Sequence, residues 1–385
     1  MVSEAKVAFR DMKKVKNANT VQRGNPDYTL FFSVLTLLAL GIVMVFSASM
    51  PRSLRFYDTA YYFIKRQGMW AVLGLISMFF FMNFDCWRYR KVIPLVYGVS
   101  LVLLTVVLVP GIGQLREGSR RWLGVGNLGF QPAELAKTTT VLFLADQLGR
   151  KRGGVRLAKD LVPYLLLVGA TAGLILMEPD LGTATILAAN SVLVLFIAGA
   201  NVWYLVGLAA LATPIVYKVI MAEDYMRTRL LAFRNPWEDP LGSGYQVIQS
   251  LYAFGSGGLF GQGIGLSRQK GFYLPQADTD FVFSVIGEEL GFFGTSLVVG
   301  LFVIIAWRGY TIAMNAPDRF SCLLAAGLTS GVVIQAAVNM GVSTGVLPIT
   351  GITLPFISYG GSSLLMSLSS VGILLNVSRY TVDRS

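Results

Sequence analysis

Four carboxylates lie in or just before one apolar segment of the sequence. Asp278 and Asp280 precede it in the letters ADTDF, and Glu288 and Glu289 lie inside it. A carboxylate in a lipid bilayer is costly, so an acid in such a place usually has a function. Asp280 could be a general base at the mouth of a cavity, where partial desolvation makes a carboxylate a stronger base. It could equally cap the helix N-terminus together with Thr279.

Glu288 and Glu289 come eight and nine residues after Asp280, which places them about 12 Å deeper along a helix. Adjacent residues of a helix point in different directions, so the two acids cannot easily share one partner. At least one of them is expected to face the interior of a bundle. We favour a structural role for both, as buried acids that are paired or protonated, and keep them as secondary site candidates.

A second polar group lies in the letters GFQPAELAK. Pro132 suits the first turn of a helix, and Glu134 follows it directly in that turn. Glu134 and Lys137 are three residues apart and therefore share one helix face. An intrahelical ion pair would explain this spacing, but a Glu–Lys face within a membrane span is also a candidate for function.

Arg120 and Arg121 precede that helix. Two guanidiniums beside a helix N-terminus suit a phosphate group, and contact with lipid headgroups is the alternative. The letters GVGNLG between them and the helix fit the pattern G-x-G-x-x-G. We expect no strand before this loop, so we exclude a dinucleotide site.

Two further segments carry turn residues. Glu178 and Asp180 bracket Pro179, which favours a tight turn with Asp180 as a cap, and Asp180 stays a secondary site candidate. Prolines and glycines interrupt the apolar stretch 345–365, which indicates either an unwound wall of a cavity or an ordinary loop. Polar groups are thus expected on one side of the membrane in four segments: 119–137, 178–182, 222–280 and 345–363.

The composition is that of a polytopic membrane protein. Of 385 residues, 54% are hydrophobic and 14% charged, and the mean hydropathy is +0.61. A net charge of +11 would suggest nucleic acid in a soluble protein, but here basic loops or anionic lipids explain it better. Histidine is absent, which excludes a Ser-His-Asp triad and the usual zinc sites. Cys86 and Cys322 form neither a disulfide framework nor a metal-ligand pattern.

The apolar runs predict an all-α bundle of ten transmembrane helices. The expected spans are 28–49, 69–84, 93–111, 133–148, 161–177, 184–200, 203–221, 281–307, 320–343 and 358–377. They form one membrane domain over residues 28–380, with tails at 1–27 and 381–385. We see no internal repeat, which weakly disfavours inverted-repeat transporters.

The distribution of lysine and arginine predicts the orientation. Eighteen of them fall in the segments that are inside when the N-terminus is inside, against seven in the short outer segments. Both termini are therefore expected in the cytoplasm, and the large loop 222–280 outside. This loop is rich in Gly, Pro and aromatic residues, so we expect short interfacial helices lying over the outer face. No cleavable signal peptide is predicted.

Five long segments occur in order along the chain: GSRRWLGVGNLGFQPAELAK, EPDLGTA, NPWEDPLGSGYQVIQSLYAFGSGGLFGQGIGLSRQKGFYLP, TDFVFSVIGEELGF and LPITGITLPFISYGGSSLL. These segments closely resemble the SEDS family (shape, elongation, division and sporulation). The resemblance runs from about residue 28 to residue 380, and it is stronger to the division and sporulation members than to the elongation members. It places the family's essential acid at Asp280 and the family's Gln-Pro-x-Glu-x-x-Lys motif at Glu134 and Lys137.

The resemblance implies a peptidoglycan glycosyltransferase that polymerises lipid II into glycan strands at the outer face of the bacterial cytoplasmic membrane. It implies a role in cell division, at the septum, or in sporulation. The implied partners are a class B penicillin-binding protein, which is a transpeptidase, and other cell-division membrane proteins, with no nucleic acid. A divalent cation, Mg²⁺ or Mn²⁺, is the one cofactor it suggests.

Our hypothesis for the mechanism needs one base to take the proton from the acceptor's sugar hydroxyl, and we assign this role to Asp280. Arg120, Arg121 and Lys137 could stabilise charge on the pyrophosphate, and Glu134 could hold Lys137 or help to bind a metal. Two other classes remain: a lipid II flippase, and a scaffold that only recruits the penicillin-binding protein. A flippase needs a polar path to both faces, whereas the interior acids cluster toward the outer side.

Overall fold

The computed structural model describes residues 23–116, 119–125, 128–151 and 158–381. Its long helices are α2 Tyr28–Tyr57, α3 Tyr62–Asn83, α4 Ile93–Leu108, α5 Pro132–Arg150, α6 Ala158–Met177, α7 Leu181–Ile197, α8 Val202–Ala222, α11 Val282–Met314, α12 Arg319–Ser343 and α13 Gly361–Ser378. Its shorter elements are η2 Tyr89–Lys91, α9 Asp224–Arg234, η3 Pro236–Glu238, α10 Tyr245–Gly257 and the strands β1 Gln114–Arg116, β2 Ser119–Val125 and β3 Leu128–Phe130.

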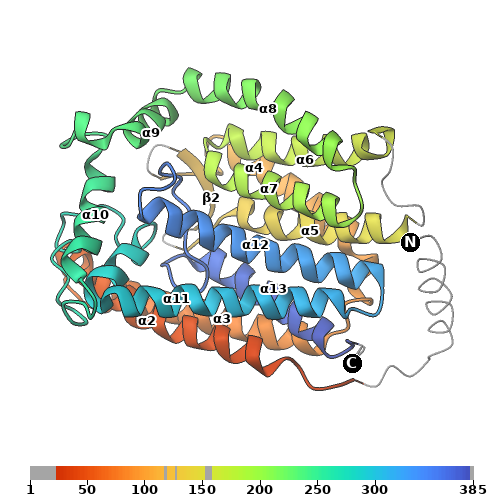
Figure 1. Ribbon diagram of the computed structural model, residues 1–385, viewed down its shortest axis with the longest axis horizontal. Helices are drawn as coiled ribbons and strands as arrows, with labels where there is room; N and C mark the ends of the chain where they lie inside the picture. Colours follow the sequence, from red (N-terminus) through yellow and green to blue (C-terminus); the bar gives the residue numbers. More distant parts are fainter. Residues whose placement is uncertain (1–22, 117–118, 126–127, 152–157, 382–385) are drawn as a thin grey trace.

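The long helices run side by side along the longest axis of the molecule (Figure 1). One end of the bundle carries β2, α9 and α10, and we call it the sheet end. At the opposite end, which we call the terminal end, the first and last described segments meet, because the Gly24 N–H donates to the Arg379 carbonyl at 2.8 Å. The segments 119–137 and 222–280, which the sequence analysis singled out for chemistry, supply β2, α9 and α10 at the sheet end.

Local sequence signals explain where several helices begin. Asp27 caps α2 by accepting from the Leu30 N–H at 2.9 Å, and Asp318 caps α12 in the same way. Pro132 opens α5, where its missing N–H costs nothing. These caps satisfy N–H groups that have no partner within the helix.

Each of the ten predicted spans coincides with a helix. By length and composition, six described helices could cross a membrane: α2, α6, α8, α11, α12 and α13. Two further apolar helices, α4 and α7, are shorter, so the count of ten crossings remains a prediction. The most apolar 18-residue stretch is 78% buried in α13 and only 6% buried in α8, which makes α13 central and α8 peripheral. In Figure 1, α8 lies along the edge of the bundle.

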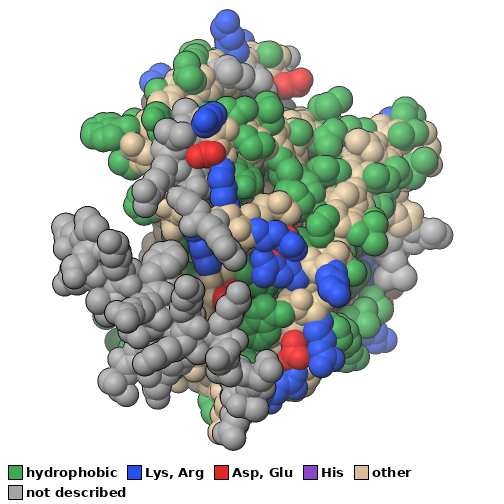
Figure 2. All heavy atoms as spheres, turned by 90° about the vertical axis from the view of Figure 1, so that its right-hand side faces the viewer, with side chains coloured by type: hydrophobic (Ala, Val, Ile, Leu, Met, Phe, Trp, Pro, Cys, Tyr) green, Lys and Arg blue, Asp and Glu red, His purple; other side chains and the backbone are tan. Residues whose placement is uncertain are grey.

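Lysine and arginine side chains gather on the terminal end, as Figure 2 shows. Many of them pair with acids there, and Asp146 is fully buried between Arg90 and Arg150. Arg308 pairs with Asp27, the cap of α2. The predicted tails 1–27 and 381–385 lie mostly outside the described residues.

Two features of the sheet end differ from the sequence-based expectation. The segment before α5 is a three-stranded antiparallel sheet in the order β1-β2-β3, with Gly124 opposite Gly129. The expectation of no strand before GVGNLG was wrong, although this strand belongs to an antiparallel sheet and not to a βαβ unit. The loop 222–280 contains α9 and α10, and α10 packs against α11 and α12.

Helix α11 breaks at Gly291, which has φ 67°. The break frees carbonyls that the preceding loop then uses: Gln262 and Gly263 donate to the carbonyls of Glu288 and Glu289 at 2.9 and 3.0 Å. A side chain at Gly291 would meet the Gly261 nitrogen at 2.4 Å. Glycine is therefore required here by both backbone angle and space.

Glu288 and Glu289, just before the break, both bind residues 267–270 of the loop before α11. Glu288 accepts from the Arg268 N–H at 2.9 Å and also from Ser267. Glu289 pairs with Lys270 at 2.7 Å, and the two side chains are 0% and 8% exposed. Both acids therefore hold the loop to α11.

Replacing Lys270 by Met is expected to destabilise the protein by about 3–5 kcal/mol, because it leaves the Glu289 carboxylate buried without its cation. The measurement is the thermal unfolding midpoint of the purified protein in detergent. Arg88→Met is the matched control, because its pair with Asp85 is 71% exposed on the arginine side and should contribute less than about 1 kcal/mol. Equal shifts in the two variants would contradict a stabilising role for the buried pair.

Candidate active site

Asp280 lies in the turn directly before α11 and lines a cavity of about 300 Å³ at the sheet end. The cap of α11 is Phe281, which makes no side-chain cap bond. Thr279 donates instead to the side chain of Gln276 at 3.0 Å. The alternative of a capping pair at the start of α11 is therefore not favoured, and the Asp280 side chain lines the cavity.

The cavity is lined mostly by polar and basic side chains from widely separated elements. Four of them are arginines, from α2, α3, β2 and α9, and three are acids. The charged lining residues are Arg52, Arg66, Arg121, Arg229, Glu134, Asp180 and Asp280. An excess of guanidiniums around a few carboxylates suits an anionic ligand.

The segment between α12 and α13 forms one wall of the cavity. Residues 345–360 contain no helix, as the prolines and glycines predict, and Gly351 lies at φ 74°. A Cβ on Gly351 would lie 3.6 Å from the Asp280 carboxylate and 3.7 Å from the Arg229 guanidinium. Gly351 therefore lets the backbone approach the acid and the arginine closely.

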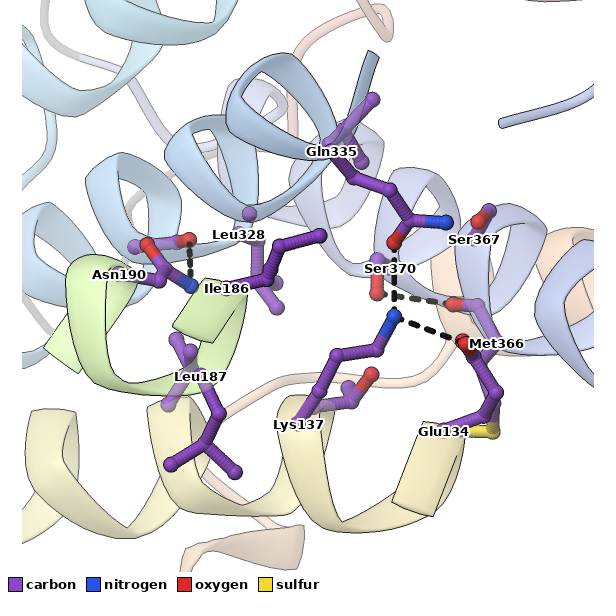
Figure 3. A pocket seen from close by; sticks show the side chains of 15 residues that line it. Glu134, Lys137, Ile186, Leu187, Asn190, Leu328, Gln335, Met366, Ser367 and Ser370 are labelled. Atoms are coloured by element: carbon purple, nitrogen blue, oxygen red, sulfur yellow. Dashed lines mark hydrogen bonds and ion pairs between the residues drawn. The ribbon is translucent and has the colours of Figure 1, made fainter. Parts of the chain in front are cut away.

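Glu134 and Lys137 form the predicted ion pair, with 2.8 Å between Lys137 Nζ and Glu134 Oε1. Lys137 Nζ also donates to Gln335 Oε1 at 2.8 Å. Figure 3 shows the lysine pointing between these two groups beside a second cavity of about 40 Å³. Glu134 lines both cavities, so this charged cluster lies between them.

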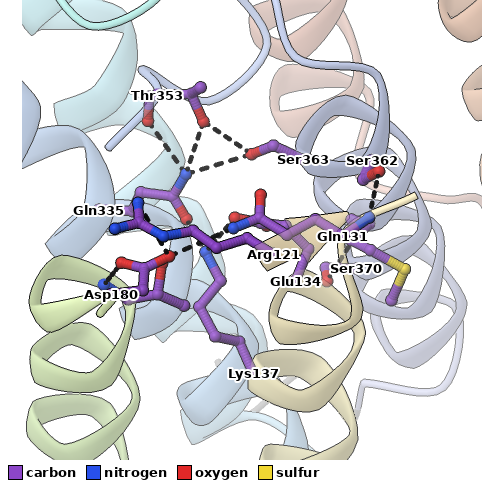
Figure 4. A network of polar contacts seen from close by, with 12 residues as sticks. Arg121, Gln131, Glu134, Lys137, Asp180, Gln335, Thr353, Ser362, Ser363 and Ser370 are labelled. Atoms are coloured by element: carbon purple, nitrogen blue, oxygen red, sulfur yellow. Dashed lines mark hydrogen bonds and ion pairs between the residues drawn. The ribbon is translucent and has the colours of Figure 1, made fainter. Parts of the chain in front are cut away.

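Asp180 is both a cap and a cavity residue. It accepts from the Thr183 N–H at 2.9 Å, as the cap of α7. It also accepts from Gln131 Nε2 at 3.2 Å, and Arg121 lies 4.0 Å away. Figure 4 shows these side chains converging with Glu134 from β2, α5 and α7.

The strand β2 separates the two arginines that the sequence grouped together. Arg121 donates to the Glu178 carbonyl at 2.9 Å and lines the cavity. Arg120 is the preceding residue of the strand, so its side chain points to the other face, and it is not among the cavity-lining residues. The expected pair of guanidiniums is therefore split, and only Arg121 reaches the cavity.

The structure does not bring the remaining candidates into this cavity. Glu288 and Glu289 bind the loop before α11, as described above, and do not line it. Asp278 is 2% exposed and pairs with Arg52 at 3.2 Å. Asp280 is thus separated from the three other acids of its segment.

Sequence reasoning missed several polar residues of the site: Arg52, Arg66, Arg229, Gln335, Asn339 and Thr353. The arginines lie in outer segments that hold other basic residues, and no motif marks them. Gln335 and Asn339 carried a usable signal, because both are amides inside an otherwise apolar span.

Glu178, in the connection between α6 and α7, is fully buried, and its carboxylate oxygens have no hydrogen-bond partner among the described residues. Its pKa is raised to about 8, first by burial and then by the Asp180 carboxylate, although the Arg121 guanidinium lowers it. The folded protein therefore holds a proton on Glu178 between about pH 4.5 and pH 8, where the unfolded chain has released it. The contribution of Glu178 to stability therefore falls as the pH rises through this range.

Glu178→Gln is expected to remove the loss of stability that Glu178 causes as the pH rises, because glutamine stays neutral at every pH. The measurement is the unfolding midpoint in detergent at several pH values from 5 to 8.5, which span the range given by the raised pKa. The wild type should lose stability relative to the variant across this range. Glu238→Gln, at an exposed position, should keep the wild-type slope. If the unfolding midpoints of Glu178→Gln and the wild type change in parallel with pH, Glu178 is not a neutral acid in the folded protein.

The chain is similar to known proteins over most of its length. The family model described as a cell cycle protein, which covers FtsW, RodA and SpoVE, matches residues 28–383. Stage V sporulation protein E of Bacillus subtilis is 45% identical over 363 residues, which cover 94% of this chain and 99% of that protein. A probable peptidoglycan glycosyltransferase FtsW of Geobacter metallireducens is 42% identical over 354 residues, which cover 91% and 94%.

Two solved structures share the fold. A peptidoglycan synthase complex, described as coordinating polymerization and crosslinking, contains a chain with a TM-score of 0.76 and 35% identity, over 92% of this chain and 98% of that one. The rod shape determining protein RodA of Thermus thermophilus has a TM-score of 0.68 and 34% identity, over 92% and 97%. The protein is a polytopic membrane protein of the FtsW/RodA/SpoVE family, to which the sequence motifs already pointed.

Proposed function

We propose that this protein is a peptidoglycan glycosyltransferase that polymerises lipid II at the outer face of the cytoplasmic membrane. The observation that carries the proposal is the Asp280 carboxylate in the wall of a cavity that four arginines line. The names of the relatives support the reaction, since several are called probable peptidoglycan glycosyltransferase FtsW.

The proposed step needs one base. Asp280 accepts the proton of the acceptor's sugar hydroxyl while that oxygen attacks the anomeric carbon of the donor. The new carbon–oxygen bond forms as the bond to the pyrophosphate breaks, and the lipid pyrophosphate leaves with the electron pair. Direct attack inverts the anomeric carbon. A positioned base contributes roughly 10²–10⁴ in rate.

The cationic groups are proposed to stabilise the pyrophosphate as its negative charge grows. Arg121 is held by the Glu178 carbonyl, which fixes the direction of its fork. Lys137 is paired with Glu134, so this pair brings an oriented dipole and not a net charge. Arg52 is likewise balanced by Asp278.

A divalent cation remains a proposal. Among the described residues, no three His, Cys, Asp or Glu side chains come together to enclose a metal ion. Mg²⁺ is often held by one or two carboxylates together with the phosphates of a substrate. The donor set therefore suits a cation that arrives with the pyrophosphate, and no step above depends on it.

The orientation is part of the proposal. Basic side chains gather at the terminal end, which suits the cytoplasmic side, and the cavity then opens outward at the sheet end. The proposed partner is a class B penicillin-binding protein, because a structural relative belongs to a complex that coordinates polymerization with crosslinking. The proposed place is the division septum or the sporulation membrane, in line with the names of the relatives.

Asp280→Asn is expected to lower the rate of polymerisation by roughly 10²–10⁴, because the amide cannot accept the proton. The assay measures glycan strands made from lipid II by the purified protein with its class B partner and Mg²⁺ or Mn²⁺. Asp85→Asn, at the terminal end among Arg23, Arg88 and Tyr380, is the control and should keep the wild-type rate.

Gel filtration and partner binding must show that both variants are folded. A folded Asp280→Asn protein with the wild-type rate would overturn the assignment of the base and favour a scaffold. If the wild type makes no polymer but moves lipid II across vesicle membranes, the flippase replaces the enzyme.

A further inference from the structure

Helix α12 presents two buried amides on one face, Gln335 and Asn339, which are 5% and 1% exposed. They are four residues apart and therefore lie one above the other. Burying an amide in a membrane bundle is costly unless it is hydrogen-bonded, so the partners of each amide indicate its role. Asn339 Oδ1 has no partner among the described residues, and only the Nδ2 of Asn339 is hydrogen-bonded.

Gln335 joins the charged cluster on α5 to the wall of the cavity. Its Oε1 accepts from Lys137 Nζ at 2.8 Å. Its Nε2 donates to the Thr353 carbonyl at 3.0 Å and lies 3.3 Å from Ser363 Oγ. Figure 4 shows the Gln335 side chain between Lys137 and Thr353. Gln335 thus ties the position of the Lys137 ammonium to the position of the loop between α12 and α13, residues 344–360.

Asn339 joins the same loop to Asp280. Its Nδ2 donates to the Ile352 carbonyl at 2.6 Å and to the Asp280 carbonyl at 2.8 Å. The loop and the segment that carries the carboxylate therefore share one donor. Asn339 fixes the backbone at Asp280 and leaves the side chain to the cavity.

The stretch 349–353 of this loop has few other hydrogen bonds: the Ile349 carbonyl accepts from Arg229 at 3.4 Å, and Thr353 Oγ1 donates to Ser363 Oγ at 2.9 Å. Residues 349–353 make no backbone-to-backbone hydrogen bond with another described residue. Gly351, in the middle of this stretch, lies against Asp280 and Arg229. The two amides of α12 therefore supply contacts that a helix or a sheet would supply elsewhere.

We propose that Gln335 and Asn339 are positioning residues, which set the distance between Asp280 and Lys137 through residues 352 and 353. This inference rests on the proposed function, because it takes Asp280 as the base and Lys137 as part of the pyrophosphate site. Neither amide acts on the substrate. A displacement of about 1 Å between such groups can lower a rate about a hundredfold.

The test uses Gln335→Met and Asn339→Leu, which keep the approximate volume and remove the hydrogen bonds. At saturating lipid II, with the class B partner present, each variant should show a kcat about ten- to a hundredfold lower, with little change in KM. The matched control is Asn376→Leu. Asn376 is also 1% exposed, and it donates to the Met82 carbonyl at 3.0 Å near the terminal end. It should lose stability but keep the wild-type kcat per folded molecule.

The double variant separates positioning from plain destabilisation. Because both amides act through one loop, the double variant should be about as slow as the slower single variant. Gln335→Asn keeps the amide on a side chain that is one methylene shorter, so it should not restore the rate. Two findings would overturn the inference: single variants with wild-type kcat, or losses in folded protein that multiply in the double variant.

The two proposals fail in different ways. If the wild type polymerises lipid II and both amide variants keep its kcat, the positioning role alone is wrong. If the wild type makes no polymer with any partner or cation tried, the proposed function is wrong, and the positioning role fails with it.

Discussion

Backbone N–H and C=O groups that leave a helix inside a membrane bundle must find partners away from water. The sheet end of this molecule is organised by that requirement. Glu288 and Glu289 accept from the loop before α11, and Asn339 donates to the loop before α13. Side chains replace the missing helical bonds at both places, and irregular backbone can then line a cavity instead of being excluded from the bundle.

This requirement also explains the large number of buried polar residues at one end. Ser358 Oγ donates to the Thr279 carbonyl at 2.5 Å and accepts from the Leu354 N–H at 2.8 Å. The Tyr359 N–H donates to the Asp278 carbonyl at 2.8 Å. The segment before α11 and the segment before α13 are thus bound to each other, although about 80 residues separate them. The turn that carries Asp280 is therefore fixed to the segment before α13 and, through Asn339, to α12.

The sequence was sufficient to predict what depends on local patterns. Apolar runs marked all ten long helices, and Pro132 marked the start of α5. The spacing of Glu134 and Lys137 was enough to predict their contact, because residues three apart on a helix must lie together. The prolines and glycines of 345–365 indicated an interrupted segment, which the structure contains.

What escaped prediction depends on contacts between distant segments. Neighbouring side chains of a strand point to opposite faces, which separates Arg120 from Arg121. The sequence analysis expected a loop there, so it kept the two arginines together. Arg229 reaches the cavity because α9 lies at the sheet end. The roles of Gln335 and Asn339 depend on carbonyls 13 to 59 residues away in the chain, which no periodicity encodes.

The contrast between Asp278 and Asp280 shows how the fold selects one acid of a pair. The two residues are separated only by Thr279, and composition gives no reason to prefer either. Asp278 lies against Arg52, at 3.2 Å, and is only 2% exposed, so a ligand in the cavity cannot reach it. Asp280 is half-buried in the wall of the large cavity, beside Gly351. A base must reach a proton on a ligand, and a half-buried carboxylate in a cavity wall can do so, whereas a carboxylate that is almost fully buried cannot. The assignment of Asp280 therefore depends on access, which the turn between Gln276 and Phe281 determines.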